Sequence, residues 1–161
     1  PILPTDTERL QQFHDRLSMN TTRLRFFSPL KHLSQNFATH LTAVDFKKRC
    51  AFVVSLPGDA DETIYAVGRY EAQTRTTAEV AFVVEDSFQG LGIGRVLLDR
   101  LVEHARSRGY TRFTAVALGE NDKMLTLFRE SPYHAHIHAE SELAFVRMDI
   151  RAAPALAAQP G

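Results

Sequence analysis

No run of apolar residues reaches the roughly 18 that a membrane span needs, and the N-terminus lacks the basic and apolar stretches of a signal peptide. The single cysteine, Cys50, excludes an internal disulfide and fits a reducing compartment. Cys50 precedes the apolar run 51–54, which predicts a buried and inert thiol. Nineteen basic and nineteen acidic residues cancel, so no general attraction to nucleic acid or anionic membranes is expected. These absences together predict a cytoplasmic protein.

What is present suits one globular domain, since 161 residues with 44% apolar content can fill a single core. We expect this domain to occupy residues 1–150. The Ala- and Pro-rich stretch 151–161 has the composition of a disordered tail or linker. The opening residues 1–4 are too short for a full strand and resemble the truncated end of one.

Helical and extended patterns alternate along the chain. Helical spacing and capping residues predict helices with apolar positions 10, 13 and 17; 24 and 27; 37 and 41; 96, 97, 101, 102 and 105; and 124, 125 and 128. Extended patterns predict strands over 51–56, 63–70, 77–84, 113–118, 133–139 and 143–150. The first three strands read as an antiparallel meander and the last two as a hairpin. The fold class is therefore predicted to be α+β, with a mixed, mostly antiparallel sheet and helices on both faces.

The most informative segment joins the third predicted strand to the long helix. It reads Gln89, Gly90, Leu91, Gly92, Ile93, Gly94. Three glycines within five residues let the backbone curl so that successive N–H groups point at one spot. The start of the helix adds the positive end of its dipole and its unpaired first-turn N–H groups. The loop is thus predicted to bind phosphate or pyrophosphate, with Arg95 available for a charge-assisted contact.

We interpret the loop as the binding site for the pyrophosphate of a cofactor, placed after a strand in the middle of the sheet. Three alternatives compete with this interpretation. A dinucleotide-binding loop would follow the first strand of a βαβ unit, whereas this loop follows three extended runs. A nucleoside-triphosphate loop would need Gly-Lys-Ser/Thr, which is absent. A glycine-rich turn without a ligand would carry a backbone-entropy cost of roughly 1 kcal/mol per glycine with no compensation.

The segment Gln89-x-x-Gly92-x-Gly94, placed after a strand and before a helix, resembles the acyl-CoA signature of the GNAT superfamily of N-acetyltransferases. Asn121, Met124 and the run Leu127-Phe128-Arg129 resemble the next motif of that superfamily. A narrower similarity, over 24–28, 41–46 and 78–82, is to the bacterial protein lysine acetyltransferases of the Pat group. Those enzymes often carry an additional regulatory domain, for which this chain has no room, so we expect a stand-alone form or an excised domain.

The resemblance implies an enzyme that transfers acetyl from acetyl-CoA to the ε-amine of a protein lysine, such as one on an acyl-CoA synthetase. Glu79, an acid within an apolar strand, is then the general base, because the amine must lose a proton before it attacks. The implied cofactor contacts are the backbone at Phe82, Val83 and Val84, the N–H groups from Gln89 to Arg95, the side chain of Asn121, and Phe128. Asn121 can equally serve only as a helix cap. A small-molecule amine acetyltransferase and a non-catalytic acyl-CoA sensor remain alternatives.

The sequence departs from the family pattern at the position where many members place a tyrosine that protonates the leaving thiolate. Phe128 stands there and has no proton to give. Tyr133 and His134 are weaker candidates for the same role, and Pro132 replaces a usual glycine. Strand spacing would place His134, His136 and His138 on one face, but no matching ligand cluster follows, so no metal site is predicted.

Overall fold

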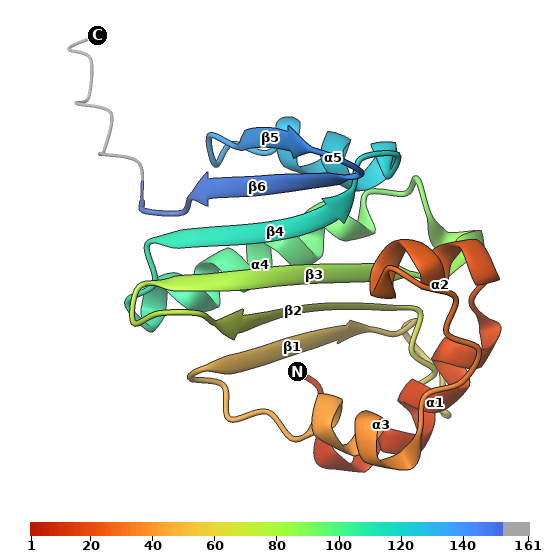
Figure 1. Ribbon diagram of the computed structural model, residues 1–161. Helices are drawn as coiled ribbons and strands as arrows, with labels where there is room; N and C mark the ends of the chain where they lie inside the picture. The colour runs from red at the N-terminus through yellow and green to blue at the C-terminus, as the bar shows by residue number, and fades with distance from the viewer. Residues whose placement is uncertain (153–161) are drawn as a thin grey trace, which may run out of the picture.

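Six strands form one sheet in the order β1-β2-β3-β4-β6-β5, within a computed structural model that describes residues 1–152 (Figure 1). The strands are β1 (Arg49–Val54), β2 (Ala66–Ala72), β3 (Thr77–Val84), β4 (Arg112–Leu118), β5 (His136–Glu140) and β6 (Leu143–Asp149). Only β3 and β4 are parallel among these pairs, and the other four pairings are antiparallel. The mixed, mostly antiparallel sheet is therefore confirmed, as are the meander and the closing hairpin.

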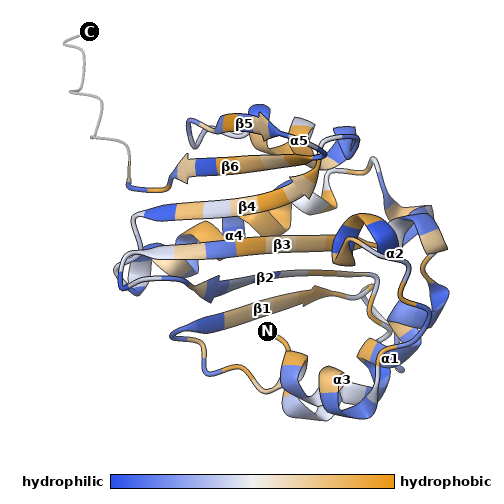
Figure 2. Ribbon diagram, viewed as in Figure 1, coloured by the Kyte–Doolittle hydropathy of each residue, from blue (hydrophilic) through white to orange (hydrophobic). Residues whose placement is uncertain are grey.

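Helices cover both faces of this sheet, as the sequence predicts (Figure 1). They are α1 (Thr7–Arg16), α2 (Met19–Phe26), α3 (Gln35–Thr42), α4 (Ile93–Ser107) and α5 (Asp122–Arg129), with short 3-10 turns at Pro4–Asp6 and Asp86–Phe88. Residues of α1 and α3 pack against β1 and β2 on one face of the sheet, whereas residues of α4 and α5 belong to the core on the other face. The hydropathy colouring shows apolar residues along much of β3 and β4, whereas polar and apolar residues alternate along the N-terminal helices (Figure 2).

Three helices begin where a polar side chain accepts a hydrogen bond from a first-turn N–H group. Ser18 accepts from Thr21 N at 3.1 Å, Ser34 accepts from Phe37 N at 3.1 Å, and Asn121 accepts from Met124 N at 3.3 Å. Such caps satisfy donors that the helix itself leaves unpaired. They fix the starts of α2, α3 and α5, all of which border the cavity or its supporting core.

Some expected details are wrong. Val96 is 59% exposed, and Leu98 takes its place on the buried stripe of α4, because the helix is rotated so that residues 97, 98, 101, 102 and 105 face the sheet. The expected strand from 133 begins only at His136, since His134 adopts a left-handed backbone with φ of 47°. Phe37 is 37% exposed and lies against Phe26 instead of entering the core.

Both chain ends bear on expectations made from the sequence. Residues 1–3 form no strand, but Ile2 is buried and its N–H donates to Ala51 O at 3.0 Å along the outer edge of β1. The predicted tail 151–161 lies outside the described residues from 153 onward. In the described part, 1–152, no helix combines the length and the apolarity that crossing a membrane would take.

The parallel pairing between β3 and β4 is short, and the two strands separate at the place where the cavity described below opens. Its register joins Thr77 to Arg112, Ala78 to Phe113 and Glu79 to Thr114, and it goes no further. Beyond Glu79 the two strands diverge, although β3 stays paired with β2 up to Val84. One edge of β3 is therefore left without a strand partner over residues 80–84.

Candidate active site

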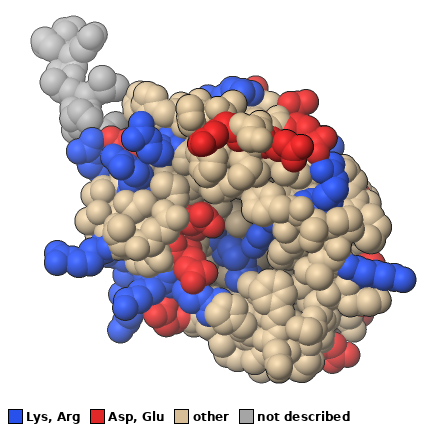
Figure 3. Space-filling model, viewed as in Figure 1, with Lys and Arg blue, Asp and Glu red and all other residues tan. Residues whose placement is uncertain are grey.

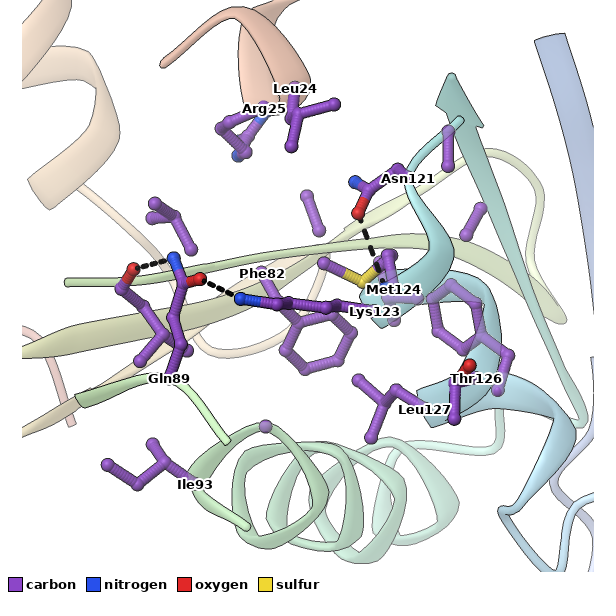
Figure 4. A pocket seen from close by; sticks show the side chains of 18 of the residues that line it. Leu24, Arg25, Phe82, Gln89, Ile93, Asn121, Lys123, Met124, Thr126 and Leu127 are labelled. Carbon is purple, nitrogen blue, oxygen red and sulfur yellow. Dashed lines mark hydrogen bonds between the residues drawn. The ribbon is translucent and has the colours of Figure 1, made fainter. Parts of the chain in front are cut away.

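A cavity of about 580 Å³ opens where β3 and β4 diverge. Its walls come from β3, β4, the glycine loop, the first turn of α4, the helix α5 and the last turns of α2. Figure 4 shows Leu24 and Arg25 descending from α2 on one side, while Met124 and Leu127 of α5 stand on the other. A volume of several hundred cubic ångströms with mixed polar and apolar walls suits an extended organic ligand.

The glycine loop has the curled backbone that its composition predicts. Gly90 and Gly92 adopt φ values of 77° and 84°, a region in which a side chain is strained. Gly94 is helical, and a Cβ there would lie 3.3 Å from Leu127 Cδ2, so its bare backbone lets α5 approach α4 closely. The N–H groups of residues 90–95 donate to no acceptor within residues 1–152. They form a row of donors at the N-terminus of a helix, which is a site for anions.

Gln89 ties this loop to two other elements. Its Nε2 donates to Val84 O at 3.0 Å, at the end of β3. Its Oε1 accepts a hydrogen bond from Lys123 Nζ on α5 at 2.9 Å, and Figure 4 shows this lysine reaching across the cavity. The side chain thus holds the loop against the strand and places a positive charge beside the row of free N–H groups.

The structure brings together nearly all the residues that the sequence singles out. The cavity is lined by Glu79, Phe82, Val83, Val84, Gln89, Gly90, Gly92, Ile93, Gly94, Arg95, Asn121 and Phe128. Leu91 does not line it, and its side chain is 69% exposed. Two expected contacts are modified: Arg95 Nε is bonded to Asp99 at 3.0 Å, and Asn121 uses Oδ1 to cap α5 while its Nδ2 has no acceptor in the described chain.

Glu79 is the one carboxylate of β3 and its following turn that lines the cavity. It lies at the last paired position before the strands diverge, and its side chain is exposed. Gln73 Nε2 donates to Glu79 Oε2 at 3.3 Å, and Gln73 Oε1 in turn accepts from the Thr114 hydroxyl at 2.7 Å. This short chain of hydrogen bonds orients the carboxylate.

The two neighbouring acids that the sequence also offers have structural partners instead. Glu85 pairs with Arg16 at 3.3 Å. Asp86 accepts from Ser18 N at 3.1 Å, from the Ser18 hydroxyl at 2.7 Å and from the Thr21 hydroxyl at 3.0 Å. Both carboxylates therefore hold the N-terminal helices against the end of β3.

Sequence reasoning missed Lys123 and Arg25, which both line the cavity. Lys123 lies two residues after Asn121 in the first turn of α5, where a basic side chain projects toward the glycine loop. Arg25 interrupts the apolar run Leu24–Phe27 on α2, and a charge inside an apolar run was the available signal. Burial lowers the pKa of Arg25 to about 10, although the nearby Glu79 carboxylate opposes this shift.

The two candidates for a proton donor, Tyr133 and His134, do not line the cavity. Phe128 does line it, but its ring is buried and packs against Phe82 with ring centroids 6.2 Å apart. The Tyr133 hydroxyl donates to Asp99 Oδ1 on α4, and neither residue lines the cavity. His136 and His138 are exposed on β5, and within residues 1–152 no cluster of three metal-ligating side chains occurs.

Comparisons with known proteins agree with this geometry. The Acetyltransferase (GNAT) family model matches residues 17–131. An acetyltransferase of Pseudomonas aeruginosa is 31% identical over 128 residues, which are 79% of this chain and 69% of that protein. The acetyltransferase Pat of Mycolicibacterium smegmatis is 35% identical over 126 residues, 77% of this chain but 37% of that longer protein. The crystal structure of the GNAT domain of S. lividans PAT has a TM-score of 0.84 at 30% identity, covering 92% of this chain and 88% of that one.

Proposed function

Because the chain belongs to the GNAT acetyltransferase family, with acetyl-CoA as co-substrate, we propose that it acetylates the ε-amine of a lysine on another protein. The family membership confirms the resemblance drawn from the glycine loop. The similarity to Pat proteins supports the choice of a protein lysine as acceptor. An acyl-CoA synthetase is the acceptor that the resemblance suggests first.

The observation that carries the proposal is the place of Glu79 at the fork between β3 and β4. The free N–H groups of residues 90–95 lie at the far end of the same cavity, where the pyrophosphate of acetyl-CoA would bind. The pantetheine arm would then run along the unpaired edge of β3, over residues 80–84, toward Glu79. Its thioester would meet the acceptor amine beside an exposed carboxylate.

Glu79 takes a proton from the incoming ammonium, directly or through a water molecule, because a lysine of pKa about 10.4 is mostly protonated at neutral pH. The neutral amine attacks the thioester carbonyl, and the attacking nitrogen then loses its second proton to solvent as the amide forms. A backbone N–H on the unpaired edge of β3, such as that of Val84, stabilises the oxyanion that develops, whereas the N–H of the neighbouring Val83 is directed at β2. When the C–S bond breaks, the electron pair leaves with sulfur, and no covalent enzyme intermediate forms.

The leaving thiolate does not receive its proton from Phe128. A thiol of pKa about 8.5 is a good leaving group as a thiolate, so proton delivery from solvent is sufficient. Solvent can reach the sulfur because the acceptor side of the cavity is open near Glu79, whose side chain is exposed. A tyrosine in the position of Phe128 is therefore not required for turnover.

The test is release of CoA thiol from acetyl-CoA in the presence of a lysine-bearing acyl-CoA synthetase and a panel of lysine peptides. We expect Glu79→Gln to lower kcat/KM by about a hundredfold or more without weakening acetyl-CoA binding. Glu71→Gln is the matched control, since Glu71 faces Glu79 in the register of β2 and β3, is exposed and does not line the cavity. Equal rates for wild type and Glu79→Gln would remove Glu79 as the base.

Two other outcomes would change the proposed function itself. Turnover with small amines but with no protein or peptide would indicate a metabolite acetyltransferase. Tight binding of acetyl-CoA without turnover of any amine would indicate an acyl-CoA sensor.

A further inference from the structure

Arg25 stands at the acceptor end of the cavity without a partner for its charge. It lies in the last turn of α2, is half-buried and lines the cavity together with Glu79. Within residues 1–152 its guanidinium makes no hydrogen bond and no ion pair, and its Cζ lies 4.7 Å from the centroid of the Phe26 ring. Arg23 on the same helix differs, because it pairs with Glu120 at 2.5 Å.

Arg25 also belongs to a cluster of three arginines. Arg69 donates to Leu41 O at 3.1 Å, and Arg49 donates to Ala43 O at 2.9 Å and His40 O at 2.8 Å, so both are engaged at the C-terminal end of α3. Burial lowers the pKa of Arg69 to about 9, and the charges of Arg25 and Arg49 lower it further. Arg25 is the member of this cluster that is free to bind something else.

The Glu79 carboxylate lines the same cavity as Arg25, and Glu71 lies opposite Arg49 in the register of β1 and β2. Figure 3 shows basic side chains at the bottom of a hollow over the middle of the sheet, beside α2, with acidic side chains along one rim. A guanidinium removed from water without a hydrogen-bonding partner is energetically unfavourable. Such a group at an active-site mouth is the expected sign of a binding residue whose partner arrives with the ligand.

We propose that Arg25 binds a carboxylate of the acceptor, and that the preferred lysine therefore lies beside an acidic side chain. This inference rests on the proposed function, since it assigns the acceptor of the same site. The lysine amine is placed at Glu79, and the carboxylate accepts two N–H bonds from Arg25 in the fork geometry that arginine provides. Phe27, 48% exposed at the end of α2 and also lining the cavity, supplies an apolar surface for the segment between the two charges.

The experiment uses a lysine peptide in which aspartate is moved through the positions from three before to three after the lysine, each paired with an asparagine peptide. For wild type we expect at least one position where aspartate raises kcat/KM about tenfold over asparagine. Arg25→Gln should abolish this preference and leave the KM for acetyl-CoA unchanged. Arg25→Glu should favour arginine over aspartate at that position. Arg23→Gln is the matched control, because Arg23 lies two residues away and does not line the cavity; it should keep the wild-type preference.

A second pair of acceptors separates the two sources of a carboxylate. Nα-acetyl-lysine and its amide differ only in the α-carboxylate. If the enzyme strongly prefers the acid, and aspartate has no effect in the peptides, then Arg25 binds the α-carboxylate of a free amino acid and the proposed acidic side chain is wrong. The affinity of the Glu79→Gln variant for the peptides, measured by fluorescence anisotropy, does not depend on turnover. If the wild type transfers acetyl to no amine but this binding still prefers aspartate through Arg25, the transferase proposal fails alone. If aspartate and asparagine are equivalent in both rate and binding, or if Arg25→Gln keeps the preference, Arg25 is not an acceptor-binding residue.

Discussion

Lys123 and Gln89 are joined across the cavity by a hydrogen bond of 2.9 Å, which connects α5 to the loop that precedes α4. The lysine ammonium consequently lies next to the N–H groups of residues 90–95, and both present positive electrostatic potential to the same space. A ligand that carries phosphates would meet a side-chain charge and a row of backbone dipoles together.

The first prediction concerns Lys123→Met, which removes the charge and keeps a long side chain. We expect acetyl-CoA to bind about five- to tenfold more weakly, since one charge-assisted contact to phosphate is lost. Calorimetry at rising salt should show a shallower salt dependence for the variant than for wild type. Lys48→Met, at an exposed position in the turn before β1, should bind acetyl-CoA like the wild type. Unchanged affinity in Lys123→Met would mean that the lysine only bridges to Gln89.

The second prediction separates backbone strain from cofactor binding with two glycines. Gly92 and Gly109 have φ values of 84° and 88°, and a Cβ at either would meet no atom within 4 Å. Alanine at each should therefore destabilise the fold by a similar amount, about 1 kcal/mol, through strain alone. Only Gly92→Ala should also weaken acetyl-CoA binding, because Gly109 lies at the opposite end of α4. Chemical denaturation and calorimetry on both variants measure the two effects, and equal loss of binding in both would show that the loop backbone has no special role.

The third prediction concerns Asp86 and pH. Its partial burial favours the neutral acid, but hydrogen bonds from Ser18 and Thr21 outweigh this and hold the pKa of Asp86 below its ordinary value. A carboxyl whose folded-state pKa is depressed stabilises the fold above its unfolded pKa of about 3.9, and this contribution is lost as pH falls through the folded-state value. Asp86→Asn should therefore lower the free energy of unfolding by about 1 kcal/mol at neutral pH. Thermal melts should show the gap between the two proteins closing below pH of about 4; a gap independent of pH would exclude the ionised carboxylate as its cause.

The fourth prediction concerns Tyr133, the nearest tyrosine in sequence to the position of the missing proton donor. Burial and the Asp99 carboxylate raise the pKa of Tyr133 to about 12, and its hydroxyl is directed at Asp99, outside the cavity. Tyr133→Phe should leave kcat and its pH profile unchanged and lower stability by about 1 kcal/mol through the lost hydrogen bond. A selective fall in kcat at high pH would instead identify Tyr133 as the acid.

Local chemistry in the sequence predicts the fold class, the meander, the closing hairpin and the loop with its phosphate-binding character. Gly90 and Gly92 illustrate why, since positive φ is a property of the residue itself. The sequence could not predict that Val96 would be exposed, because the angle of α4 about its own axis is decided by packing against the sheet. It also could not reveal Lys123 or the free charge of Arg25. Those depend on which side chains from distant elements meet across the divergence of β3 and β4.

The fork in the sheet has one more consequence. Within the sheet, the halves β1–β3 and β4–β6 are joined by only three paired positions between β3 and β4. The amide protons on the open edge of β3, at alternate residues between 80 and 84, have no strand to shield them. They should exchange quickly with deuterated water in the free protein and slowly once acetyl-CoA is bound, because in the proposed binding mode the pantetheine chain would act as a seventh strand.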